Sequence, residues 1–297
     1  MRALVLSGGS TRGALQVGAL RALVERGFEF DLIIGVSIGS LNGVFFAHNP
    51  GMETVKKLEN IWLSVKKKDI FPEGRVKALI RVISNKKSLF SNDALYKFVL
   101  KNTPVMTFAE LKVRTLIPAV DIKTKDVYVF GKDPYDSVPD ALMASSALPP
   151  YFPPWKYKGM MLIDGGFYSN LPYDIAINEG AKEIVALHIT GGRSFDDEIY
   201  NIYGILAKSV GILLEARLKE QVEIAKKKRA KVLYIPLEPP VDVSIFDFTK
   251  TKLLIEMGYE QAVKALEERE KDGFANRMKG LFKKITDLKG VLTSKKS

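Results

Sequence analysis

Short apolar runs alternate with segments of helical spacing along most of the chain. The runs are rich in β-branched residues and cover 3–7, 31–36, 113–120, 126–130, 160–164, 183–189 and 231–236. Strands that alternate with helices are typical of an α/β protein whose largely parallel sheet is covered on both faces. The run at 126–130 is predicted to form a hairpin with the one before it, so we expect a mixed sheet.

Residues 52–102 interrupt this alternation with three helical segments, at 52–65, 74–83 and 92–102. They predict a helical insertion packed on the sheet, and a candidate lid. Two long helices are predicted at 199–228 and 249–271. We expect one domain over residues 1–270, followed by a basic amphipathic tail at 271–297.

The most apolar later segment, residues 202–214, is too short to span a bilayer. It is 13 residues long and contains Lys208, whereas a transmembrane helix needs roughly 20 apolar residues. It therefore predicts a buried or interfacial helix.

Cysteine is absent from the 297 residues, which excludes disulfides, thiolate metal sites and cysteine nucleophiles. The N-terminus also lacks the pattern of a secretory signal. Together these features favour a cytoplasmic protein.

The net charge of +11 is concentrated in two segments. Residues 54–102 carry a net +8 and residues 271–297 a net +6. Such asymmetry indicates a polyanionic partner, and here we expect peripheral association with an anionic membrane. Solvated lysine-rich helices are the alternative. Nucleic acid is not expected, because no phosphate-loop lysine or nucleic-acid motif is present.

The glycine-rich loop SGGSTRG follows the first predicted strand. Main-chain N–H groups of the Gly8–Gly13 loop, at the start of the next helix, can bind a phosphate or the oxyanion of an ester under attack. Ser10 breaks the dinucleotide-binding pattern, and no lysine follows Gly13 as a P-loop requires. A plain tight turn is the alternative.

The pentapeptide GVSIG at 35–39 matches the nucleophile-elbow pattern. A predicted strand precedes it and a predicted helix follows, so Ser37 is a candidate nucleophile between Gly35 and Gly39. The helix N-terminus would favour negative charge developing there.

A third stretch, MMLIDGG, ends a predicted strand at Asp164 and turns away through Gly165 and Gly166. A carboxylate shielded from water at a strand end is a candidate general base. In isolation, an Asp that caps a turn explains the pattern equally well.

Neither of the two histidines is well placed to act as the general base for Ser37. His48 lies about 16 Å along the helix that follows Ser37, which is too far away. His188 lies within a predicted strand, where we expect a histidine bonded in the core. The order Ser37, Asp164, His188 nevertheless matches an α/β-hydrolase triad, so this alternative stays open.

Taken together, GGSTRG, GVSIG and DGG resemble the patatin-like phospholipase family. The stretches ASSALPPYFPPW (144–155) and LFSNDALYKFVL (89–100) are also similar to that family, and the resemblance covers about residues 3–270. It implies a three-layer α/β/α sandwich and a lipid acyl hydrolase acting on phospholipid or other fatty-acyl esters, without metal or cofactor.

By this resemblance Ser37 is the nucleophile and Asp164 the general base. The residues expected around the oxyanion are Gly8, Gly9, Ser10 and Ile38, and Arg12 matches a basic residue that braces the loop or contacts a lipid phosphate. Ser10 departs from the family, which usually has a third glycine there, and a serine tolerates positive φ poorly. A non-catalytic lipid-binding protein on the same fold is a further alternative.

Overall fold

A computed structural model describes residues 1–71, 88–190, 202–240, 243–244 and 246–271. The strands are β1 (Arg2–Leu6), β2 (Leu32–Gly35), β3 (Arg114–Asp121), β4 (Val127–Phe130), β5 (Trp155–Tyr157), β6 (Met160–Asp164), β7 (Glu183–Ile189) and β8 (Lys231–Leu237). All seven predicted strands are present. The three-residue strand β5 was not predicted, because so short a run carries no periodicity of its own.

A helix is present within each of the segments predicted at 52–65, 92–102, 199–228 and 249–271. The helices are α1 (Ala14–Glu25), α2 (Ile38–His48), α3 (Met52–Ser64), α4 (Lys67–Ile70), α6 (Asp93–Asn102), α7 (Val138–Ser145), α8 (Tyr173–Asn178) and α9 (Ile202–Lys227), with a further helix over 251–271. Short 3₁₀ turns occur at η1 (Ser10–Gly13), η2 (Phe108–Glu110) and η3 (Gly165–Phe167). The helix predicted at 74–83 and nearly all of the tail predicted at 271–297 lie outside the described residues.

The sheet has the strand order β5-β6-β3-β2-β1-β7-β8, with β4 paired to β3. Strands β3, β2, β1, β7 and β8 are parallel, whereas β3–β4, β3–β6 and β5–β6 are antiparallel. The predicted hairpin of β3 and β4 is therefore present, and the sheet is mixed, as expected.

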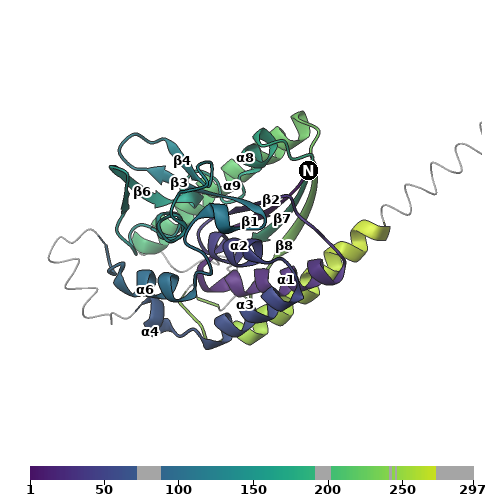
Figure 1. Ribbon diagram of the computed structural model, residues 1–297, viewed down its shortest axis with the longest axis horizontal. Coiled ribbons are helices and arrows are strands. Elements are labelled where there is room, and N and C mark those ends of the chain that lie inside the picture. The colour runs from purple at the N-terminus through teal and green to yellow at the C-terminus, as the bar shows by residue number, and fades with distance from the viewer. Residues whose placement is uncertain (72–87, 191–201, 241–242, 245, 272–297) are drawn as a thin grey trace, which may run out of the picture.

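The two faces of the sheet carry separate cores, because alternate residues of a strand point to opposite sides. Leu4 and Leu6 of β1 pack with α1, α2, α3 and the helix over 251–271, whereas Ala3 and Val5 pack with α8 and α9. Figure 1 shows these helices on the two sides of the sheet. The chain is thus a three-layer α/β/α sandwich, as predicted.

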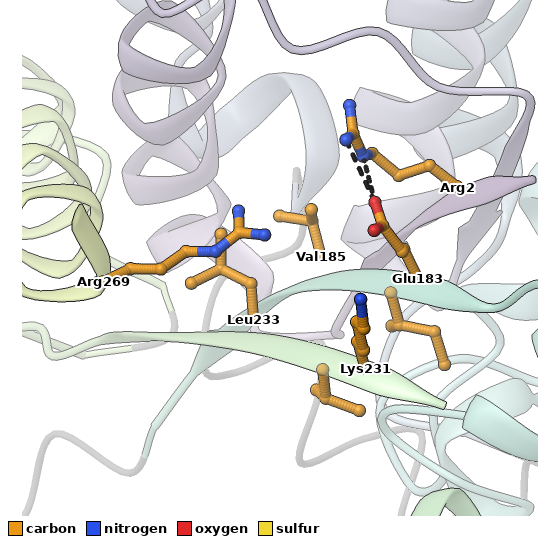
Figure 2. Close-up of a pocket in the computed structure, with 8 residues that line it drawn as sticks. Arg2, Glu183, Val185, Lys231, Leu233 and Arg269 are labelled. Atoms are coloured by element: carbon orange, nitrogen blue, oxygen red, sulfur yellow. Dashed lines mark hydrogen bonds and ion pairs between the residues drawn. The ribbon is translucent and has the colours of Figure 1, made fainter. Parts of the chain in front are cut away.

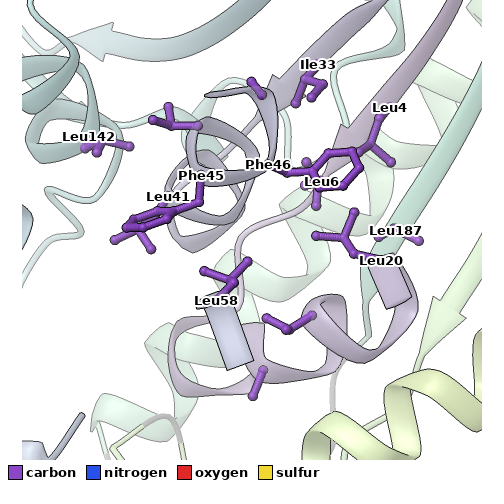
Figure 3. Packing of buried hydrophobic residues seen from close by; sticks show 14 of the residues in the cluster. Leu4, Leu6, Leu20, Ile33, Leu41, Phe45, Phe46, Leu58, Leu142 and Leu187 are labelled. Atoms are coloured by element: carbon purple, nitrogen blue, oxygen red, sulfur yellow. The ribbon is translucent and has the colours of Figure 1, made fainter. Parts of the chain in front are cut away.

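Helix α2 runs through the larger core and has almost no exposed face. Nine of its eleven residues are buried, and Figure 3 shows Phe46 directed towards Leu4 and Leu6 of β1. Burial on this scale fixes the start of α2, where Ser37 lies, against the centre of the sheet.

Candidate active site

Ser37 occupies a strained turn between β2 and α2. Its backbone has φ 52° and ψ −124°, a conformation that costs a residue with a side chain on the order of 1–3 kcal/mol. Its backbone N–H donates a 3.0 Å hydrogen bond to Oγ of Ser145. A nucleophile elbow places its serine on such a strained turn. Here the half-buried Ser37 is held in that conformation by its hydrogen bond to the buried Ser145.

The flanking glycines allow α2 to approach the sheet closely. A Cβ atom on Gly35 would lie 2.4 Å from Cα of Ser40, and one on Gly39 would lie 2.5 Å from the carbonyl oxygen of Leu6. Both contacts are with backbone, which cannot rotate away. The glycines of GVSIG are therefore required by packing.

The glycine-rich loop lies beside this turn. A Cβ on Gly8 would be 3.1 Å from Cβ of Ser37, and one on Gly13 would be 2.6 Å from Cγ1 of Ile38. Ser10 has φ 54°, so the serine adopts the left-handed conformation that glycine usually takes. The loop and the first turn of α2 thus bring together the backbone that was expected around an oxyanion.

One expected oxyanion donor is already engaged. The Gly8 N–H donates a 2.8 Å hydrogen bond to Oδ1 of Asn170, so the expectation that Gly8 binds an oxyanion is not supported. Arg12 donates from Nε to the carbonyl oxygen of Gly9 at 3.4 Å, while burial lowers its pKa. Of the two roles considered for Arg12, this contact fits bracing of the loop.

Asp164 ends β6 with its side chain almost fully buried, at 3% exposure. Burial raises its pKa to about 6, although hydrogen bonds from the Gly166 amide and the Ser37 side chain act in the opposite direction. The Gly166 bond measures 2.7 Å. A carboxylate with this pKa is mostly ionised at neutral pH and is a stronger base than an exposed aspartate.

Gly165 permits the turn after Asp164. A Cβ there would lie 2.2 Å from the carbonyl oxygen of Pro118 in β3, so no other residue fits without moving the strand. Gly165 and Gly166 therefore both fix the carboxylate, one through packing and one through a hydrogen bond.

The last residue of α7 and the turn that follows it contact both candidate catalytic residues. Ser145 accepts from the Ser37 amide, and the carbonyl oxygen of Ala147 accepts a 3.1 Å hydrogen bond from the Asp164 amide. The stretch ASSA had been noted only as part of the family resemblance and was given no role. Its signal in the sequence is two small hydroxyl residues in an otherwise apolar helix end.

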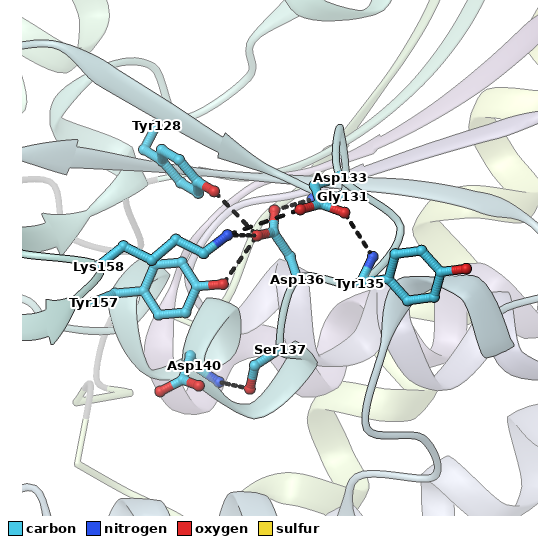
Figure 4. Close-up of polar contacts among 9 residues, drawn as sticks. All are labelled: Tyr128, Gly131, Asp133, Tyr135, Asp136, Ser137, Asp140, Tyr157 and Lys158. Carbon is cyan, nitrogen blue, oxygen red and sulfur yellow. Dashed lines mark hydrogen bonds and ion pairs between the residues drawn. The ribbon is translucent and has the colours of Figure 1, made fainter.

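The other end of α7 is held by a buried carboxylate, Asp136. Figure 4 shows the groups that converge on it, which come from β4, β5 and the turns next to them. They are the hydroxyls of Tyr128 and Tyr157 at 3.0 and 2.9 Å, Nζ of Lys158 at 2.9 Å and the Gly131 amide at 3.3 Å. This cluster fixes the start of α7, and so the position from which Ser145 reaches Ser37.

The structure separates the histidines from this arrangement. Nδ1 of His188 lies 2.7 Å from the hydroxyl of Tyr234 on β8, and burial lowers the pKa of His188 to about 4. The imidazole is half-buried rather than enclosed in the core as expected, and its partner Tyr234 is 40% exposed. His48 ends α2, as predicted.

A cavity of about 200 Å³ lies elsewhere, at the amino ends of β1, β7 and β8. Figure 2 shows Lys231 and Arg269 lining it, together with the 3.0 Å ion pair of Arg2 and Glu183. It is at the opposite edge of the sheet from Ser37. Within the described part of the chain no cluster of side chains could hold a metal ion.

Comparison with known proteins agrees with the fold and these motifs. The family model described as patatin-like phospholipase matches residues 4–177. The patatin-like phospholipase domain-containing protein ZK370.4 of Caenorhabditis elegans is 28% identical over 292 residues, covering 89% of this chain and 20% of the relative. Human patatin-like phospholipase domain-containing protein 6 is 28% identical over 282 residues, covering 87% of this chain and 20% of the relative.

Among solved structures, VipD from Legionella pneumophila superposes with a TM-score of 0.50 at 17% identity, covering 90% of this chain and 67% of VipD. That likeness concerns the fold alone. The chain spans about a fifth of the length of these two curated relatives. With a family model that matches more than half of its residues, the chain belongs to the patatin-like phospholipase family.

Proposed function

We propose that this chain is a serine lipid acyl hydrolase that cleaves fatty-acyl esters through Ser37 and Asp164. The observation that carries the proposal is the buried Asp164 carboxylate, which has a pKa of about 6 and is hydrogen-bonded by the Ser37 side chain. An ionised carboxylate that interacts with the serine hydroxyl can accept its proton during acyl transfer.

In the first step Ser37 Oγ attacks the ester carbonyl carbon while Asp164 accepts the hydroxyl proton. The carbonyl π electrons move to oxygen and form an oxyanion. The proposed donors to this oxyanion are the backbone N–H groups of Gly9, Ser10 and Ile38. Loss of one such donor typically costs about 10²–10³ in rate.

Collapse of the tetrahedral intermediate breaks the bond to the leaving alcohol, which takes the proton from Asp164. Water then attacks the acyl-enzyme, again giving its proton to Asp164, and the Ser37 oxygen leaves with that proton. The fatty acid is released and both side chains return to their starting states. Ser37 lies at the first turn of α2, where the helix dipole also favours the developing negative charge.

A lipid ester as substrate is supported by the family to which the chain belongs. The relatives include a Drosophila melanogaster protein named neuropathy target esterase sws, which is 30% identical over 203 residues, covering 68% of this chain and 13% of the relative. We infer that phospholipids or lysophospholipids are hydrolysed, and that the protein reaches them by peripheral association with a membrane. None of the helices in the described residues is both long and apolar enough to cross a bilayer.

Two alternatives make different predictions. A triad with His188 as base would have to move His188 away from Tyr234, its hydrogen-bond partner. A non-catalytic lipid-binding protein would leave Ser37 unreactive towards a fluorophosphonate probe.

The experiment that tests the proposal is hydrolysis of phosphatidylcholine, lysophosphatidylcholine and a soluble short-chain ester, with the products identified by mass spectrometry. Wild type should release fatty acid, whereas Ser37→Ala should release none above background. Ser64→Ala, at an exposed serine that ends α3, is the matched control and should retain full activity. Equal activity in Ser37→Ala and wild type would refute the proposal.

A further inference from the structure

A row of charged side chains crosses the amino edge of the sheet. Arg2 of β1 pairs in register with Glu183 of β7, which in turn pairs with Lys231 of β8. Two residues further along, Val185 and Leu233 form the next pair on the same face, because alternate residues of a strand share a side. This is the face that carries the larger core. The charged row therefore lies directly beside an apolar floor.

A further cation reaches this row from the layer of helices above it. Arg269 lies near the end of the helix over 251–271, and Figure 2 shows its side chain pointing from that helix towards the cavity. Its guanidinium carbon is 5.9 Å from the centre of the Phe28 ring, and that of Arg2 is 5.3 Å from the same centre. One aromatic ring thus contacts both arginines. Together with the charged row and its apolar floor, they enclose the cavity of about 200 Å³.

The charges around this cavity are not balanced. Nε and Nη2 of Arg2 lie 3.1 and 3.0 Å from the same oxygen of Glu183, Oε2. Within the described part of the chain, neither Lys231 nor Arg269 forms an ion pair with a carboxylate. Three cations and one carboxylate leave an excess of two positive charges, carried by side chains from β8 and from the helix over it.

This excess matches the charge of a phosphate monoester. Such a group carries about −1.5 to −2 charges at pH 7, whereas a carboxylate carries one. The guanidinium of Arg269 can present paired N–H groups to phosphate oxygens, and the ammonium of Lys231 adds a compact charge. A phosphate held between the two would therefore neutralise both.

The remaining lining suits a short carbon skeleton that carries hydroxyl groups. Val185 is only 2% exposed and offers an apolar contact at the base of the cavity. Oε1 of Glu183 accepts no hydrogen bond from the described residues, so it is available to a ligand hydroxyl. A volume of about 200 Å³ is below the roughly 300–1,000 Å³ of pockets for drug-sized molecules, so the ligand must be small.

We propose that this cavity binds a small phosphate monoester of a polyol, with its phosphate between Lys231 and Arg269 and one of its hydroxyls on Glu183. The site is separate from Ser37. Arg2, Glu183 and Lys231 are the first residues of their strands, whereas Ser37 follows the carboxyl end of β2. Because the cavity lies at the opposite edge of the parallel strands, the inference goes beyond the proposed hydrolase function.

The position of Glu183 favours a small ligand over a polyanionic surface. Its carboxylate stands in the row between Arg2 and Lys231. A membrane or another extended polyanion would meet this negative charge together with the cations and would be repelled by it. A small ligand can instead place its phosphate on the cations and its hydroxyl on the carboxylate.

The test is isothermal titration calorimetry of the full chain with glycerol 3-phosphate at low ionic strength, compared with inorganic phosphate and with glycerol. We expect wild type to bind the ester more tightly than either. Lys231→Gln/Arg269→Gln should weaken binding at least tenfold, because both charged donors to the phosphate are removed. Lys123→Gln/Lys264→Gln, at two exposed lysines that do not line the cavity, lowers the net charge equally and should bind like wild type.

Thermal unfolding followed by circular dichroism checks that each variant is folded. Unchanged ester binding in Lys231→Gln/Arg269→Gln would overturn the proposal, as would equal weakening in both double variants, since net charge alone would then explain it. Inorganic phosphate bound as tightly as the ester would overturn the assignment of a polyol ester. Binding to phosphatidylglycerol vesicles without any binding of the ester would overturn it in favour of a membrane contact. None of these measurements depends on hydrolysis by Ser37.

Discussion

The side-chain oxygen Oδ1 of Asn170 accepts a 2.8 Å hydrogen bond from the backbone amide of Gly8, 162 residues away in the sequence. This bond joins the turn after Asp164 to the glycine-rich loop beside Ser37. It therefore couples the position of the candidate base to that of the proposed oxyanion donors.

Asn170→Ala should lower kcat for a soluble ester by about 10–100-fold with little change in KM. The substitution leaves the Gly8 amide without its partner and loosens the loop, so the loss falls on stabilisation of the transition state. Asn102→Ala is the matched control, because the Asn102 amide bonds only within α6. An Asn170→Ala enzyme with wild-type kcat would show that the loop holds its shape without this bond.

The activity should rise with pH through about 6 and then level off. Asp164 must be ionised to accept a proton, and burial raises its pKa to about 6. Below that value the protonated acid cannot act as a base, so kcat/KM for a soluble ester falls about tenfold per pH unit. The measurement is a pH–rate profile from 4.5 to 8.5, and a limb centred near 4 would contradict the buried-base assignment.

Asp164→Asn should stabilise the fold at neutral pH. The folded-state pKa of this carboxyl is raised, so burying its charge destabilises the native state above about pH 6, and this penalty disappears as the pH falls towards 3.8. The shift corresponds to a gain of about 1–3 kcal/mol in the free energy of unfolding for the variant at pH 8. Urea denaturation at pH 8 and pH 4.5 measures it, and an equal difference at both values would exclude this origin.

Ser145→Ala should reduce both stability and activity. It leaves the Ser37 amide without its acceptor in a partly buried site, which costs about 1–3 kcal/mol, and it releases the strained backbone of Ser37. Ser64→Ala, at an exposed serine that ends α3, controls for loss of a hydroxyl. Chemical denaturation and ester hydrolysis are the two readouts, and an unchanged midpoint would argue against strain held by Ser145.

His188→Ala should retain most of the esterase activity. The imidazole bonds Tyr234 rather than Ser37 or Asp164, and its pKa of about 4 leaves it neutral at working pH. Initial rates on the same soluble ester check this expectation. A loss of 10³-fold or more, as on removal of a triad histidine, would restore the triad alternative.

The sequence alone determined the elements and the identity of the candidate pair. Strand and helix patterns depend on residues close together in the sequence. All seven predicted strands are present because most of the apolar residues in these runs are buried within the sheet. The motif GVSIG likewise predicts its own strained turn, since glycine is needed on both sides of Ser37 for α2 to approach β1 and β2.

The tertiary structure decided which residues of these elements contact one another. Three features depend on residues far apart in the chain. They are the hydrogen bond from the Gly8 amide to Asn170, the contacts of Ser145 and Ala147 with Ser37 and Asp164, and the burial that raises the pKa of Asp164. The exposure of Ile205, Ile212 and Leu213 on α9 is a similar case: these apolar residues are evident in the sequence, but a run of isoleucine and leucine does not indicate which side of a helix is covered. Exposure depends on where Gln221 and Ala225 anchor that helix, which is a property of the packed fold.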